Sequence, residues 1–229
     1  VLIQKKQRYV FDRLFTVPGA TLLEVGDENR CTIDQLQDAI GPNTVAVAYR
    51  VLKDQPEGEL SLRDVVNEAH SRNLPVIADA ASQIYPIDYF RETVQSADLV
   101  CIGAKYMGAP HSSGLVCGTK ELIQSVKAQD FIGFETEGHV AFGRAMKIDR
   151  QEIIGVVAAL DEWLAIDHEE RLLDFEAKVS VIRDILLTVP NVEVKVEYTS
   201  AIWIASIYVS FDTEVLGKNS DQVVEQLFD

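Results

Sequence analysis

An acid and a lysine stand at the ends of two apolar runs in this chain, and the two residue types together can carry covalent chemistry. Asp79 closes the run 76–78, and Lys105 follows the run 99–102. Short apolar runs of this kind predict buried parallel strands, and ligands of open α/β sheets bind outside the carboxyl ends of such strands. A lysine amine can form a Schiff base, and an acid can hold a ring nitrogen protonated so that the ring accepts electrons. The pair is therefore what a pyridoxal 5'-phosphate site requires.

The loop around Lys105 favours this chemical interpretation over an ordinary surface lysine. Gly103 and Gly108 flank the lysine, and glycine lets a backbone approach a ligand closely. Partial desolvation in such a tight loop would lower the pKa of the amine and leave more of the nucleophilic free base. Alone, a lysine at a strand end can equally be structural.

The residues after Asp79 strengthen a signal that is weak in isolation, because acids after strands often cap the next helix. Ala81 leaves room for a flat ring to stack, while Ser82 and Gln83 offer neutral hydrogen-bonding groups. We therefore expect Asp79, Ala81, Ser82 and Gln83 to contact the cofactor. The acid and the lysine are informative as a pair, and neither is informative alone.

Several other polar residues are candidates for binding the substrate. His111 and Ser112 open a short segment with hydroxyls near a glycine, which is either a phosphate or substrate contact or a polar turn. Arg144 and Lys147 form a local basic pair, which either meets an anionic group or lies on the surface. His139 falls in a plausible active-site loop. The histidines are scattered and show no metal-ligand spacing, so no metal site is expected.

Composition limits the classes of partner. The 229 residues carry a net charge of −15, which disfavours nucleic acid as a partner and is typical of a solvated acidic surface. No apolar span approaches the ~18 residues that a membrane helix needs, and the first residues lack the order of a signal peptide. Cys31, Cys101 and Cys117 form no CxxC pair, so we expect a reducing, cytoplasmic setting, with Cys101 and Cys117 as small core residues.

The elements that must position these residues alternate between strands and helices, which predicts an α/β fold with a mostly parallel sheet. Thr32 with Gln35, and Ser61 with Asp64, are helix-start signals. The apolar run 114–118 follows Lys105 too closely to leave room for a crossover helix, so it predicts an antiparallel strand. The predicted strands cover residues 20–25, 44–49, 75–78, 99–102 and 114–118, and the predicted helices cover 32–40, 61–71, 87–95 and 120–128.

The last third of the chain has a different pattern. Two long helical patterns come first, over residues 152–166 and 169–187. Two segments that alternate with period two follow, over 192–198 and 202–211, and a helix begins at Ser220. We therefore expect a large domain over residues 1–150, connecting helices over 151–187, and the start of a small α+β domain over 188–229. The chain begins without Met and ends inside a helical pattern, so we expect it to be a fragment.

Three blocks, in this order, carry a resemblance to a known family. They are Val76-Ile77-Ala78-Asp79-Ala80-Ala81-Ser82-Gln83, then Gly103-Ala104-Lys105 with Gly114-Leu115-Val116-Cys117-Gly118, then Gly143-Arg144-Ala145-Met146-Lys147 with Glu152-Ile153-Ile154-Gly155. As a set they resemble the selenocysteine-synthase-like branch of the fold-type-I pyridoxal phosphate enzymes, over roughly residues 1–170. That branch contains seryl-tRNA selenium transferases and amino-sugar-acid ammonia-lyases.

The resemblance implies a three-layer α/β sandwich, the large domain of fold type I, followed by part of a small α+β domain. It implies Lys105 as the Schiff-base lysine, Asp79 as the partner of the ring nitrogen, and Ala81 against the face of the ring. It also implies a homodimer or a larger homo-oligomer. Two positions depart from the family pattern: Ile102 replaces a serine that helps to hold the cofactor phosphate, and Gly108 replaces an arginine. The family's glycine-rich phosphate-binding segment would precede residue 1.

Three functions follow as hypotheses. The first is a pyridoxal phosphate-dependent lyase that acts on a small amino acid or amino-sugar acid, by α,β-elimination to a keto acid and ammonia. The second is selenium transfer on seryl-tRNA, against which the acidic charge counts. The third is a cofactor-free, degenerate homologue with a structural or regulatory role, for which Ile102 and Gly108 are the best evidence.

Overall fold

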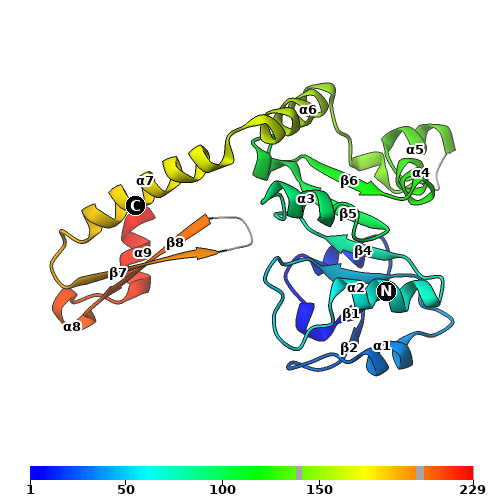
Figure 1. Cartoon of the computed structure of the whole chain (residues 1–229), viewed down its shortest axis with the longest axis horizontal. Helices are drawn as coiled ribbons and strands as arrows, with labels where there is room; N and C mark the ends of the chain where they lie inside the picture. Colours follow the sequence, from blue (N-terminus) through cyan, green and yellow to red (C-terminus); the bar gives the residue numbers. More distant parts are fainter. Residues whose placement is uncertain (138–140, 200–203, 229) are drawn as a thin grey trace. The chain divides into compact units, whose positions relative to one another are not determined.

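The computed structural model describes residues 1–137, 141–199 and 204–228, and it divides the chain into two compact units (Figure 1). The first unit is Val1–Leu164 and the second is Ala165–Asp229. The boundary falls inside the segment predicted to contain connecting helices. No helix in these three described ranges is both long and apolar enough to cross a lipid bilayer.

The first unit is built on a six-stranded sheet in the order β2-β1-β3-β4-β5-β6. All neighbouring strands are parallel except β6, which pairs antiparallel with β5. The predicted α/β class and the antiparallel last strand are therefore confirmed. The strands are β1 (Leu2–Gln4), β2 (Leu23–Val25), β3 (Val47–Arg50), β4 (Val76–Asp79), β5 (Leu99–Gly103) and β6 (Gly114–Gly118). β1 was not predicted from the sequence.

Two helices of this unit begin at the capping residues that the sequence signals, whereas α5 (Phe131–Glu137) was not predicted. The Thr32 hydroxyl accepts from the backbone N–H of Gln35, whose side chain accepts from the Thr32 N–H, so the capping box is present. The Ser61 hydroxyl accepts from the Asp64 N–H in the same way. The α-helices are α1 (Ile33–Ala39), α2 (Leu62–Ser71), α3 (Ile87–Thr93), α4 (Lys120–Ala128), α5 (Phe131–Glu137) and α6 (Arg150–Ala165). Short 3-10 helices are η1 (Lys5–Gln7), η2 (Asp12–Phe15), η3 (Ala104–Met107) and η4 (Gly143–Ala145).

The hydrophobic core lies on one face of the sheet, which we call the core face. Val76, Ala78 and Val100 are all 0% exposed, and they belong to the same cluster as Val65 and Ala69 of α2. Val156 and Ala159 of α6 belong to this cluster too. Because side chains alternate along a strand, the residues between these core positions point to the opposite face.

That opposite face, the pocket face, is much less covered. It carries Ile77 and Asp79 of β4, which are half-buried, and Cys101 of β5, which is exposed. Val116, the register partner of Cys101 in β6, is 44% exposed. The prediction that Cys101 is a small core residue is therefore wrong, because in β5 the core positions are Val100 and Ile102. Cys117 is half-buried and pairs with Val100.

The second unit pairs a long helix with a hairpin and two short helices. α7 (His168–Leu186) is capped by the side chain of Asp167. β7 (Val192–Thr199) and β8 (Ile204–Phe211) pair antiparallel with Val192 opposite Phe211, as the period-two pattern predicts. α8 (Thr213–Leu216) and α9 (Ser220–Phe228) follow.

Candidate active site

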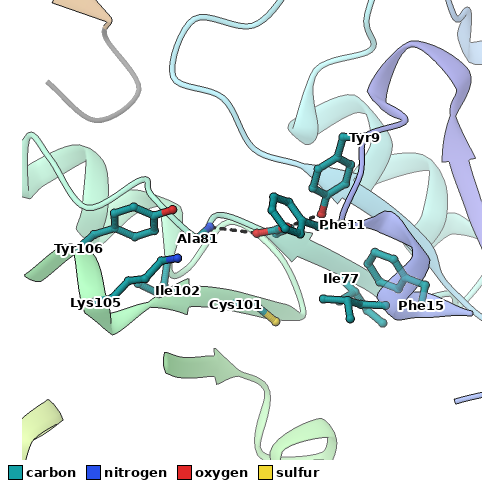
Figure 2. A pocket seen from close by; sticks show the side chains of 12 residues that line it. Tyr9, Phe11, Phe15, Ile77, Ala81, Cys101, Ile102, Lys105 and Tyr106 are labelled. Carbon is teal, nitrogen blue, oxygen red and sulfur yellow. Dashed lines mark hydrogen bonds between the residues drawn. The ribbon is translucent and has the colours of Figure 1, made fainter. Parts of the chain in front are cut away.

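A cavity of about 420 Å³ opens on the pocket face at the carboxyl ends of β4 and β5 (Figure 2). The sheet and the loops that follow its strands contribute Ile77, Asp79, Ala81, Cys101, Ile102, Gly103, Lys105 and Tyr106 to the wall. The N-terminal segment contributes Tyr9, Phe11, Leu14 and Phe15. The predicted acid and lysine therefore line one cavity, at the place where parallel α/β sheets bind ligands.

Asp79 is the last residue of β4, and both of its carboxylate oxygens have a hydrogen-bond donor. The backbone N–H of Ala81 donates to Oδ1 at 3.0 Å, and the hydroxyl of Tyr9 donates to Oδ2. In the register of the sheet, Asp79 has Arg50 of β3 on one side and Cys101 of β5 on the other. These contacts fix the orientation of a carboxylate that lines the cavity.

Lys105 lies in η3, directly after β5, with an exposed side chain. Its Nζ is 5.1 Å from the centre of the Tyr106 ring, and Figure 2 shows the two side chains at the same end of the cavity. This turn lies close to the loop that follows β4, because the N–H of Gly103 donates to the carbonyl of Ala81 at 2.8 Å. A side chain at Gly103 would crowd the Tyr106 ring at 3.0 Å. The glycine thus allows the turn after β5 to lie close to the loop after β4, whereas the predicted close approach to a ligand stays a prediction.

Gly108 ends η3 with a φ of +92°, in the left-handed region that glycine adopts readily. This conformation gives a structural reason for the departure from the family's arginine, since a residue with a Cβ would be strained there. Ile102, the other departure, is 3% exposed and belongs to the core cluster.

The N-terminal wall of the cavity was missed by the sequence analysis. Tyr9 is half-buried and its ring meets Phe11 edge-on at 6.1 Å. Figure 2 shows Tyr9, Phe11 and Phe15 at the opposite end of the cavity from Lys105. Three aromatic residues within seven positions were the available signal, but they follow neither a helical nor a strand period.

The cavity also exposes a thiol beside the acid. Cys101 is reachable from the cavity, yet many protein atoms surround its sulfur. This partial desolvation, and then the nearby carboxylate of Asp79, raise the pKa of the Cys101 thiol. The thiol is consequently a weaker nucleophile at neutral pH than an ordinary surface cysteine.

Of the predicted cofactor contacts after Asp79, only Ala81 lines the cavity. Gln83 is 1% exposed, and its Oε1 accepts from the backbone N–H of Lys53 at 3.2 Å and from the hydroxyl of Tyr89. Its amide donates to the hydroxyl of Ser82 at 3.3 Å. In this structure Gln83 therefore connects the loop after β4 to the Lys53 backbone and to Tyr89 of α3.

The weaker substrate candidates lie away from the cavity wall. His111 and Ser112 are exposed, and the Ser112 hydroxyl donates to Glu152 at the start of α6. The Arg144 guanidinium lies 5.0 Å from the Phe131 ring of α5 and 3.5 Å from Glu135. Nζ of Lys147 lies 4.6 Å from the same Phe131 ring. His139 lies outside the described residues.

Helix α6 braces the loops that follow both strands of the site. Trp163 Nε1 donates to the carbonyl of Ile84, five residues after Asp79, at 3.0 Å. Near the other end of the helix, Gly155 lies against Pro110, and a Cβ there would come within 2.9 Å of the proline ring. The Ser112–Glu152 hydrogen bond adds a second contact to the loop after Lys105. One helix therefore supports both the loop after the acid and the loop after the lysine.

The chemistry of the lining residues fits the ring of pyridoxal phosphate. Lys105 supplies an amine for an aldehyde, Asp79 supplies an acceptor for a protonated ring nitrogen, and the wall is otherwise mainly apolar and aromatic. Lys105 is the sole cation among the described lining residues, so they offer no second cation to the phosphate group. Within the described ranges no group of histidines, cysteines and carboxylates could hold a metal ion.

Comparison with known proteins confirms the resemblance carried by the motifs. The chain is 32% identical, over 91% of its length, to D-glucosaminate-6-phosphate ammonia lyase of Salmonella typhimurium, of which it covers 53%. It is 27% identical, over 85% of its length, to L-seryl-tRNA(Sec) selenium transferase of Carboxydothermus hydrogenoformans, of which it covers 42%. The chain thus spans about half the length of the curated relatives it matches. No family model matches it.

The fold agrees with that of the first of these relatives. A solved structure of D-glucosaminate-6-phosphate ammonia-lyase superposes with a TM-score of 0.75 at 26% identity, over 99% of this chain and 58% of that one. The expected sandwich, with a mostly parallel sheet and flanking helices, is therefore confirmed, and the similarity extends through both compact units.

Proposed function

We propose that this chain carries the lysine-and-acid part of a pyridoxal phosphate-dependent lyase site. The substrate would be a small amino acid or amino-sugar acid, from which α,β-elimination gives a keto acid and ammonia. The observation that carries the proposal is the placement of Lys105 and Asp79 in the wall of one cavity at the carboxyl ends of β4 and β5. The similarity to an ammonia lyase over most of the chain supports it.

The roles of the chain's own residues follow from their positions. When bound, the cofactor would supply an electron sink next to the carbon that loses its proton. Nζ of Lys105 would hold the cofactor's aldehyde carbon until substrate replaces it, and the freed amine would then accept the α-proton as a general base. Asp79 would accept a hydrogen bond from the ring N–H through Oδ2. Ala81 would leave space for the flat ring, and the aromatic wall would exclude water.

Four further assignments are also proposals. We assign an anionic substrate group to Arg144 and Lys147, because they are a pair of cations in an acidic chain. The sequence pattern is the basis for assigning ligand binding to Ser82, Gln83, His111 and Ser112. A homo-oligomer is proposed from the family resemblance alone. A cytoplasmic location is proposed from the three free cysteines.

Selenium transfer on seryl-tRNA is the second candidate function, supported by similarity to selenium transferases. The net charge of −15 disfavours it, because an acidic surface repels the phosphates of a tRNA. A cofactor-free role remains the third candidate, because Ile102 packs in the core and offers no hydroxyl to a phosphate group.

Covalent trapping tests the proposal. The chain and its Lys105→Ala variant are incubated with pyridoxal 5'-phosphate, reduced with borohydride, digested and mapped by mass spectrometry. We expect an adduct on the peptide that contains Lys105 and its loss in the variant. Lys53→Ala is the matched control, because this lysine lies outside the cavity wall and its replacement should leave the adduct intact. Equal labelling of the parent and both variants would contradict the proposal.

A further inference from the structure

Tyr9 comes from a different part of the chain than the strands of the site, yet it touches the acid directly. Its hydroxyl donates to Oδ2 of Asp79, while the backbone N–H of Ala81 donates to Oδ1 at 3.0 Å. With one donor on each oxygen, the carboxylate cannot rotate about its terminal bond without breaking a hydrogen bond. The remaining lone pairs therefore keep a fixed direction in the cavity.

Tyr9 is itself held by a partly buried charged pair. The Arg50 guanidinium lies 5.5 Å from the centre of the Tyr9 ring, within the range of a cation–π contact. Nη2 of Arg50 lies 3.7 Å from Oε1 of Glu59, whose side chain is 1% exposed. Since Arg50 is also the register partner of Asp79, the phenol stands over the strand pair that carries the acid.

The phenol keeps its proton in this place. Burial, followed by the hydrogen bond to Asp79 and the charge of that carboxylate, raises the pKa of Tyr9. Tyr9 is therefore a hydrogen-bond donor over the whole range in which the protein would be assayed. A phenylalanine at this position would keep the ring and remove only the donor.

Hydrogen bonds weaken steeply when donor and acceptor are misaligned, so a carboxylate that must receive a ring N–H gains from being held in one orientation. We propose that Tyr9 is a positioning residue that fixes Asp79 to receive a protonated ring nitrogen, and that it thereby makes the cavity select ligands that carry such a nitrogen. This inference rests on the proposed function, because that function assigns the ring nitrogen to Asp79.

The test compares two ligands that differ at one atom. Dissociation constants are measured for pyridoxal 5'-phosphate and for its analogue with a C–H in place of the ring nitrogen. A charge-assisted hydrogen bond to a well-placed acid predicts about tenfold or greater preference for pyridoxal phosphate in the parent chain. We expect Asp79→Ala to abolish the preference. Tyr9→Phe should reduce it severalfold and leave the affinity for the analogue unchanged.

Two further variants separate positioning from a structural role. Phe11→Leu removes a neighbouring part of the aromatic wall. It should therefore weaken the binding of both ligands equally and preserve the ratio of their dissociation constants. Tyr9→His restores an N–H donor, and it should recover part of the ratio if Tyr9→Phe has lost it. Circular dichroism of each variant establishes that the comparison is made on folded protein.

The outcomes distinguish this inference from the proposed function. If the parent discriminates and Asp79→Ala does not, but Tyr9→Phe keeps the full ratio or weakens both ligands equally, the role of Tyr9 is refuted and the proposed function stands. If the parent shows no preference for the ring nitrogen and no trapped adduct on Lys105, both fail together.

Discussion

The two faces of the sheet in the first unit use the same strands in different ways. In β4 and β5, Ala78 and Val100 of the core face are fully buried, while the adjacent residues Asp79 and Cys101 line a cavity. The core face is closed by helices that follow the strands in sequence. The pocket face is bordered by residues 9–15, more than sixty positions before Asp79. A single strand thus supplies stability with one side and chemistry with the other.

The largest expected contrast between the faces is in their contribution to stability. Ile102→Ala removes a side chain that is 3% exposed from the core cluster, and it should lower the free energy of unfolding by about 2–5 kcal/mol. Cys101→Ala, one position earlier on the pocket face, should change it by less than about 1 kcal/mol. Chemical denaturation of both variants checks this. Similar losses would mean that the pocket face is packed as tightly as the core face.

A smaller effect should follow from loosening the N-terminal wall of the cavity. Asp12 in η2 is 3% exposed, and its carboxylate accepts from the Arg8 side chain and from the Tyr9 backbone N–H. The Arg8 side chain is 38% exposed, so solvent screens its attraction to Asp12. Asp12→Asn should therefore lower the free energy of unfolding by about 1–2 kcal/mol at pH 7.

The cost of Asp12→Asn should depend on pH in a defined direction. The Arg8 side chain, together with the Tyr9 N–H, holds the pKa of Asp12 below its usual value. A lowered native pKa contributes stability that is fully present above the unfolded-state pKa of about 4 and is lost as the pH falls through the native pKa. The difference in free energy of unfolding between parent and variant, measured by chemical denaturation, should therefore be constant from pH 7 to about 5 and become smaller below about pH 4. A difference that grew on acidification would contradict this ion pair.

A further effect, similar in size to that of Asp12→Asn, concerns the turn after the lysine. Gly108→Ala places a Cβ at a φ of +92°, where surrounding space is open but the backbone is strained, and it should cost about 1–2 kcal/mol. Gly41→Ala is the matched control, because Gly41 also has open space around it but no left-handed φ. Thermal unfolding of the two variants measures the difference, and an equal change in both would show that the turn is not strained.

The sequence predicted the core face better than the pocket face, and the reason is physical. Val76, Ala78 and Val100 belong to short apolar runs, so their burial follows from a local period. Capping residues such as Thr32 and Ser61 likewise act within four positions. Asp79 and Lys105 could be placed together because the ends of parallel strands meet at one edge of the sheet. The contact between Tyr9 and Asp79 joins residues seventy positions apart, and no local pattern encodes it.

The contacts of α6 mean that the loop after the acid and the loop after the lysine are both supported by a helix that carries neither residue. Trp163 anchors one end of α6 to the loop after Asp79, and Gly155 seats the helix against Pro110 in the loop after Lys105. Because α6 contacts both loops, a displacement of this helix would reach both sides of the cavity without any change in the sheet. A bulky side chain at position 155 would press on Pro110 and displace the loop after Lys105, while every residue that lines the cavity stayed unaltered.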